Sequence, residues 1–130
     1  TMVRALRWAD AAVSQDAVER LVSTRLGWRV TSLDDVRGND DPDERQRLAR
    51  LGASDAPVLV VAESFEPPSK SVQRLLHAVR ASVGAHVPVV VGLYGGPGDQ
   101  AQPRPDDVRI WRQRVRALGD PWLRVEVLSS

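Results

Sequence analysis

The sequence has no cysteine, one lysine (Lys70), one methionine, and aromatic side chains at only 5% of its positions. Without cysteine, the chain cannot form disulfides, thiolate metal sites or thiol nucleophiles. Its longest apolar runs, residues 57–62 and 87–95, are far shorter than the roughly 20 residues that a membrane-spanning helix needs. With 18 basic and 17 acidic residues, the net charge of +1 gives no strong signal for nucleic-acid binding.

Common signatures of catalysis and nucleotide binding are also missing. The sequence has no G-x-x-x-x-G-K-[ST] phosphate loop, no G-x-G-x-x-G fingerprint and no G-x-S-x-G elbow. His77 and His86 are the only histidines, and neither has a carboxylate or second histidine at metal-ligand spacing. We therefore predict no metal site and no cofactor, and we assign no catalytic residue.

The chain does contain short β-rich segments that alternate with amphipathic ones. Strands are predicted over residues 3–9, 28–33, 57–62, 88–93 and 122–128. Helices are predicted over residues 14–27, 43–51, 69–83 and 108–118. This order predicts one α/β domain over residues 1–130, a three-layer αβα sandwich with a mostly parallel five-stranded sheet of Rossmann-like or flavodoxin-like type. Because Thr1 precedes Met2, we expect the domain to be excised from a longer chain.

Two apolar runs predict the centre of the sheet. Residues 57–62 and 88–93 are continuously apolar, which is typical of parallel strands buried on both faces. Residues 122–128 alternate apolar and charged side chains, which predicts an edge strand. Trp8 and Trp122 are both predicted to lie on edge strands, where a second copy of the chain could pair.

Residues at the predicted helix ends fit capping rules. Ser14 is a suitable N-cap, and Gly27 suits the left-handed position after a helix. Gly52 is predicted to stop the helix over residues 43–51. Residues 37–43 contain glycine, asparagine, proline and three aspartates, so a loop is predicted there.

Polar and glycine residues follow three of the predicted strands. Open α/β sheets bind ligands where loops leave the carboxyl ends of their strands. The candidate ligand-binding residues at these exits are Asp10, Glu63, Ser64, Gly95, Gly96 and Gly98. The glycines could form an anion-binding nest, or they could simply begin a long surface loop. Glu63 and Glu66 could instead stabilise the start of the following helix.

The last predicted helix has Arg109, Arg112 and Arg116 on one face. Such a face suits phosphate, RNA or an acidic partner. A solvated face opposite the core position Trp111 explains the same residues. No aromatic side chain is predicted on the same face as these arginines, so the face lacks the base-stacking feature of nucleic-acid binders.

Two segments carry a family resemblance: residues 57–68, with the Leu75-Leu76-x-x-x-Arg80 helix behind them, and residues 111–125. They resemble the soluble carboxyl-terminal part of an uncharacterised proteobacterial family, a domain of unknown function. Members of that family are multi-span membrane proteins, and their genes accompany a GTPase-like protein. The resemblance implies a cytoplasmic location, tethering to the inner membrane through flanking sequence, and a GTPase-like partner.

The segment over residues 57–68 also resembles the second half of a GTPase fold, where a similar strand precedes a proline-marked turn. No phosphate loop precedes it, and no Asn-Lys-x-Asp motif follows Val91. The resemblance therefore implies no nucleotide specificity.

The combination of a well-specified fold with no recognisable reactive group favours a non-catalytic interaction or regulatory domain of a bacterial membrane-associated protein. The alternative is a domain that binds a small ligand, nucleotide or phosphate through the loops after the two central strands.

Overall fold

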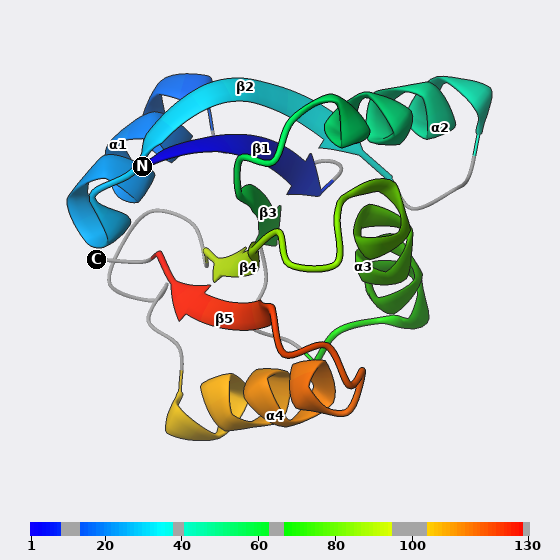
Figure 1. Ribbon diagram of the computed structural model, residues 1–130. Coiled ribbons are helices and arrows are strands. Elements are labelled where there is room, and N and C mark those ends of the chain that lie inside the picture. Colours follow the sequence, from blue (N-terminus) through cyan, green and yellow to red (C-terminus); the bar gives the residue numbers. More distant parts are fainter. Residues whose placement is uncertain (9–13, 38–40, 63–66, 95–103, 129–130) are drawn as a thin grey trace.

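The computed structural model (Figure 1) describes residues 1–8, 14–37, 41–62, 67–94 and 104–128. Within these ranges the chain alternates strands and helices, as predicted. In chain order the elements are β1 (Met2–Trp8), α1 (Gln15–Leu26), β2 (Arg29–Val36), α2 (Pro42–Ala49), the 3₁₀ turn η1 (Arg50–Ala53), β3 (Val58–Ala62), α3 (Lys70–Ser82), β4 (Val89–Leu93), α4 (Pro105–Arg116) and β5 (Leu123–Val127).

The strands form one sheet in the order β2-β1-β3-β4-β5, and every neighbouring pair is parallel. This is the flavodoxin-like strand order. The adjacent placement of β3 and β4 and the edge position of β5 confirm the sequence prediction. The edge position predicted for the strand of Trp8 is wrong, because β2 pairs with β1 along its whole length, from Met2↔Arg29 to Trp8↔Val36.

The core lies on both faces of this sheet, in two clusters of buried side chains. One face is covered by α2, α3 and α4, which contribute Leu48, Leu76 and Trp111 to its cluster. On the other face, Val18 and Val22 of α1 are fully buried. Figure 1 shows α1 and α3 on opposite sides of the strands, and the three-layer arrangement is confirmed.

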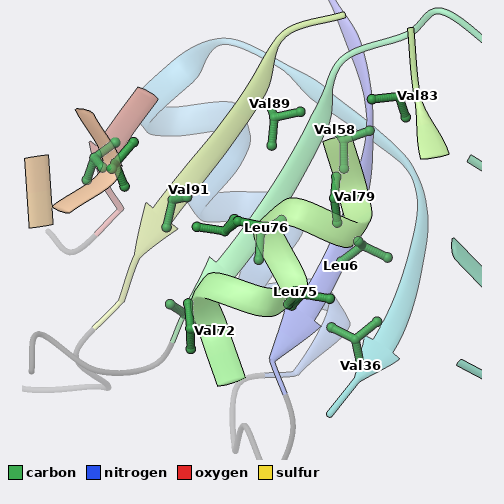
Figure 2. Close-up of a cluster of buried hydrophobic side chains, with 14 of the residues drawn as sticks. Leu6, Val36, Val58, Val72, Leu75, Leu76, Val79, Val83, Val89 and Val91 are labelled. Atoms are coloured by element: carbon green, nitrogen blue, oxygen red, sulfur yellow. The ribbon is translucent and has the colours of Figure 1, made fainter. Parts of the chain in front are cut away.

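Helix α3 packs an apolar stripe against the middle of the sheet (Figure 2). Leu75, Leu76 and Val79 face Leu6 of β1 and Val58 of β3. Fully burying one aliphatic side chain of this size contributes roughly 1.5–3 kcal/mol relative to leaving it exposed. The stripe therefore anchors α3 to β1 and β3.

The ends of α1 confirm the capping prediction. The Ser14 hydroxyl accepts a hydrogen bond from the Ala17 N–H at 3.1 Å. After the helix, Gly27 has a φ of +67°, which glycine adopts without steric cost. Local sequence is sufficient here because both caps use groups close together along the chain.

The second helix starts earlier than predicted and does not stop at Gly52. Its N-cap is Asp41, whose carboxylate accepts a hydrogen bond from the Glu44 N–H at 2.7 Å. Beyond the helix, Gly52 lies inside η1. A Cβ atom at position 52 would lie 2.9 Å from the Ser82 carbonyl oxygen of α3. Glycine at this position thus permits the close approach of η1 to the end of α3.

A buried arginine joins β1 to the connection that precedes β3. The Arg4 guanidinium donates hydrogen bonds to the carbonyl oxygens of Leu51 and Ala56. Burial lowers the pKa of Arg4, while the nearby carboxylate of Asp55 acts in the opposite direction. Because both acceptors lie about fifty positions away in the sequence, no local pattern predicts this contact.

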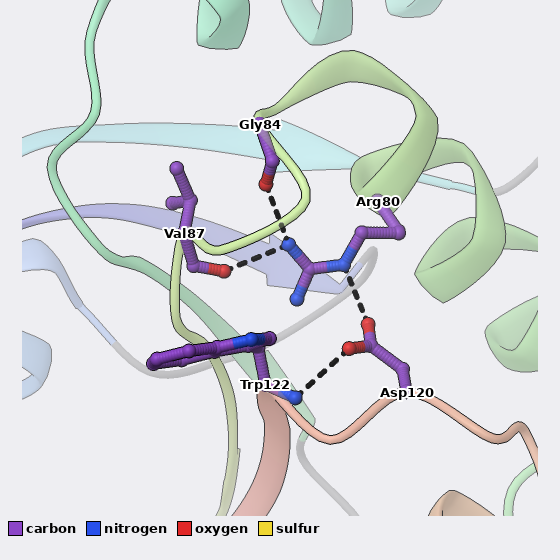
Figure 3. Close-up of polar contacts among 5 residues, drawn as sticks. All are labelled: Arg80, Gly84, Val87, Asp120 and Trp122. Carbon is purple, nitrogen blue, oxygen red and sulfur yellow. Dashed lines mark hydrogen bonds and ion pairs between the residues drawn. The ribbon is translucent and has the colours of Figure 1, made fainter.

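A second arginine, Arg80, binds the segments that precede β4 and β5 (Figure 3). Arg80 donates from Nη1 to the carbonyl oxygens of Gly84 and Val87 at 2.9 and 2.8 Å, and from Nε to Asp120 at 2.5 Å. The other carboxylate oxygen of Asp120 accepts from the Trp122 N–H at 2.9 Å. Arg80 is only 21% exposed, so it belongs to this contact and not to the open polar face of α3.

Candidate interaction surface

The six ligand-site residues predicted from the sequence all lie outside the described residues: Asp10, Glu63, Ser64, Gly95, Gly96 and Gly98. The described strands nevertheless end side by side, since Ala62 of β3 pairs with Leu93 of β4 and Arg7 of β1 pairs with Val61. The chain thus leaves β1, β3 and β4 at the same end of the sheet. That the six residues form a ligand site stays a prediction.

The two histidines lie apart on the surface. His77 is exposed on α3, and His86 is exposed in the connection before β4. The His86 ring meets the Trp122 ring edge to face, with ring centres 5.6 Å apart. Within the described ranges, no group of three or more His, Cys, Asp or Glu side chains could hold a metal ion.

The arginines of α4 lie beside the strand at the edge of the sheet. Arg109, Arg112 and Arg116 are all exposed, while Trp111 and Val115 of the same helix are buried. Arg109 pairs with Asp106 one turn earlier, at 3.1 Å. The side chains of Arg112 and Arg116 have no ion pair or hydrogen bond in the described part of the chain.

These two unpaired arginines line an open groove between α4 and β5, which we call the α4–β5 groove. It has a volume of about 640 Å³. Its walls are formed by Arg112, Val115, Arg116, Gly119, Asp120, Pro121, Leu123, Arg124 and Val125. A second depression continues along α4 past Arg109 and Gln113 and shares Arg112 and Arg116 with the first.

The electrostatic character of the α4–β5 groove is positive. Asp120, the one carboxylate among its described lining residues, is already bound by Arg80 and by the Trp122 N–H. Arg124 contacts Glu126 at 3.5 Å, and its guanidinium carbon lies 5.3 Å from the centre of the Trp28 ring. Unpaired guanidinium groups at a surface are suited to carboxylates and phosphates, which they can bind through two parallel hydrogen bonds.

The sequence predicts the arginine face of α4 but not the groove. Helical spacing alone places Arg109, Arg112 and Arg116 together. The contribution of β5 depends on the turn after α4, where Gly119 has a φ of +73° and returns the chain alongside the helix. The Gly119-Asp120-Pro121 sequence was the available signal, since it predicts a turn between α4 and the edge strand.

Comparisons with known proteins identify a family for this chain. A family model described as "Protein of unknown function (DUF2868)" matches residues 5–120, which extends well before the segments that carried the resemblance. The comparisons with curated proteins and with solved structures found no significant match. No helix among the described residues is both long and apolar enough to cross a bilayer. The chain belongs to the DUF2868 family, whose function is unknown.

Proposed function

We propose that this domain is a non-catalytic interaction domain that binds an acidic protein partner at the α4–β5 groove. The observation that carries the proposal is the pair of exposed arginines, Arg112 and Arg116, which have no partner within the described ranges. Charged groups left without an internal partner contribute little to folding and remain available to a binding partner.

The lining of the groove favours protein over nucleic acid. Exposed Pro121 and half-buried Leu123 contribute apolar surface beside the arginines, while Val115 and Val125 are buried. Among the described residues, no aromatic side chain lines either depression along α4, so base stacking finds no platform on them. Apolar surface mixed with arginine is typical of protein interfaces.

Binding of a short poly-glutamate peptide tests the proposal. We expect the domain to bind the labelled peptide at low salt and to bind it more weakly as salt rises towards about 0.15 M, because ions screen exposed charges. The double variant Arg112→Gln/Arg116→Gln should weaken binding by about tenfold or more. Fluorescence anisotropy measures both effects.

The matched control is Arg20→Gln/Arg25→Gln on α1, which makes the same change in net charge at two other exposed arginines. We expect this control to bind like the parent. Equal losses in the two double variants would attribute binding to net charge and contradict the proposal. Tighter binding to a single-stranded oligonucleotide than to poly-glutamate would contradict it as well.

The resemblance described above supports a more specific proposal about the partner and its location. We propose that the partner is a GTPase-like protein with an acidic surface. We also propose that the domain works in the cytoplasm of a bacterium, tethered to the inner membrane through flanking sequence. Fractionation of cells that produce the full-length protein tests the location, and recovery in the soluble fraction would contradict the tether.

A second candidate function is binding of a nucleotide or phosphorylated metabolite at the carboxyl ends of β3 and β4. The adjacency of these strand ends favours it, because ligands of open α/β sheets bind at such positions. A ligand at one hundred times its dissociation constant would add about 2.7 kcal/mol to the free energy of unfolding. A thermal-shift screen that shows no stabilisation by nucleotides or sugar phosphates would count against this function.

A further inference from the structure

We infer that the acidic partner binds as an extended strand that adds to the outer edge of β5, with its carboxylates directed at Arg112 and Arg116. The inference rests on the proposed function and specifies how the partner is recognised. It is carried by three features of the described residues: the unpaired backbone of β5, the spacing of the two arginines, and the charge of the opposite sheet edge.

The outer edge of β5 offers backbone hydrogen-bonding groups. On the inner side, the Val89 N–H donates to the Trp122 carbonyl oxygen and the Leu128 N–H donates to the Leu93 carbonyl oxygen, both at 2.8 Å. Since residues of a parallel ladder alternate in the direction of their backbone groups, Val125 and Val127 direct their N–H and C=O groups outwards. No described strand pairs with that edge.

The arginines are spaced to match alternate residues of an added strand. Helix α4 and β5 run in opposite directions in Figure 1, so a strand added beside β5 would run along the axis of α4. Arg112 and Arg116 are one helical turn apart, about 6 Å along the axis. Alternate residues of a strand are about 6.6 Å apart and point to the same face. Two glutamates at alternate positions could therefore meet the two arginines together.

The charges at the two edges of the sheet favour binding of an acidic strand at β5 over binding at β2. Strand β2, at the opposite edge, carries Asp34, which would repel an acidic segment, and Asp35, whose carboxylate is already bound by Arg7. The α4–β5 groove instead offers two unpaired arginines on the face covered by α4. An acidic partner strand thus has one electrostatically favourable edge in the described sheet.

The probe for the test is a short capped peptide of alternating threonine and glutamate, together with two N-methylated versions. One version is methylated on the threonine nitrogens and the other on the glutamate nitrogens. Each keeps the charge but blocks hydrogen bonding along a different edge of the peptide. We expect one version to bind about tenfold or more weakly than the parent peptide and the other to bind like it.

Hydrogen exchange supplies a second readout on the protein. We expect the Val125 and Val127 amides to exchange more slowly in the presence of the parent peptide, because each would then donate to a carbonyl oxygen of the added strand. The matched reference is β4, whose residues pair on both sides in the free protein and should show little change.

The possible outcomes separate the two proposals. Equal affinities of the two methylated versions, whether both high or both low, would overturn strand addition. If the peptide still binds through Arg112 and Arg116 in that case, the proposed function survives. Absence of binding by both this peptide and poly-glutamate overturns both proposals. Slow exchange at Val125 that depends on protein concentration without peptide would assign the edge to a second copy of the chain and overturn the inference.

Discussion

At the scale of single residues, Arg7 and Asp35 show how the sheet register sets the behaviour of a charge. They are partners in the parallel ladder between β1 and β2. The Arg7 guanidinium donates from Nε to Oδ1 at 2.7 Å and from Nη2 to Oδ2 at 3.0 Å. The hydrogen bonds from Arg7, and then the charges of Arg7, Arg47 and Arg37, hold the pKa of Asp35 below its ordinary value despite partial burial.

The sign of this shift predicts how stability depends on pH. A carboxyl group with a lowered pKa in the folded state stabilises the fold above its unfolded-state pKa, and this contribution is lost as pH falls through the folded-state pKa. Asp35 is 57% exposed, so we expect Asp35→Asn to lose only up to about 1 kcal/mol at neutral pH. The difference from the parent should disappear in acid.

Urea unfolding at a series of pH values measures this difference. The control is Asp34→Asn on the same strand, since Asp34 has no ion pair in the part of the chain that the structure describes. A difference between parent and Asp35→Asn that grows as pH falls would contradict the assignment.

At the scale of elements, β4 shows how one missing side chain permits a close contact. Gly92 lies in a strand that is buried on both faces. A Cβ atom there would lie 2.5 Å from Leu128 Cδ1 and 3.2 Å from Leu59 Cδ1. Leu128, which follows β5, is itself fully buried. Because Gly92 has no side chain, the Leu128 side chain can pack directly against the backbone of β4.

We predict that Gly92→Ala lowers the free energy of unfolding by about 1–3 kcal/mol through overpacking. Adding Leu128→Ala should relieve the clash, so the double variant should lose less stability than the two single variants together. Chemical denaturation of all three variants gives the coupling energy. Gly84→Ala is the control, because a Cβ atom there would make only an ordinary 3.5 Å contact with Val87. Additive losses would contradict the packing role of Gly92.

At the scale of the whole molecule, Arg80 joins three segments, one of which is distant in the sequence from the other two. It extends from α3 to the connection before β4 and to the turn between α4 and β5. The Asp120 side chain is only 15% exposed, so removal of Arg80 would leave a mostly buried carboxylate with its N–H donor but without its counter-charge. The contact therefore helps hold the amino ends of β4 and β5 together.

We predict that Arg80→Ala costs about 2–4 kcal/mol, because it removes charge-assisted hydrogen bonds and leaves acceptors unsatisfied. Arg80→Lys should recover part of the loss through its charge. The unfolding transitions followed by circular dichroism and tryptophan fluorescence should still coincide. Arg74→Ala, on the exposed face of the same helix, is the control and should cost less than about 0.5 kcal/mol. Equal losses at positions 74 and 80 would contradict this role for Arg80.

The sequence was informative where the signal is local or periodic. The apolar stripe of α3 and the caps of α1 were predicted because their residues lie within a few positions of one another. The edge position predicted for the strand of Trp8 was wrong because no local pattern shows that β1 pairs with both β2 and β3. In the fold, Arg4 is buried against distant carbonyl oxygens and Arg7 pairs with Asp35 of β2.

By itself, the amino-acid order determined the α/β class, the central pair of strands and the arginine face of α4. Burial on two faces leaves a continuous apolar run in the sequence, and a helix leaves a repeat of three to four residues. Only the tertiary structure decided the position of β1, the contacts of Arg80 and the placement of Arg112 and Arg116 beside the free edge of β5. These features depend on segments that are distant in the chain and meet only when the sheet assembles.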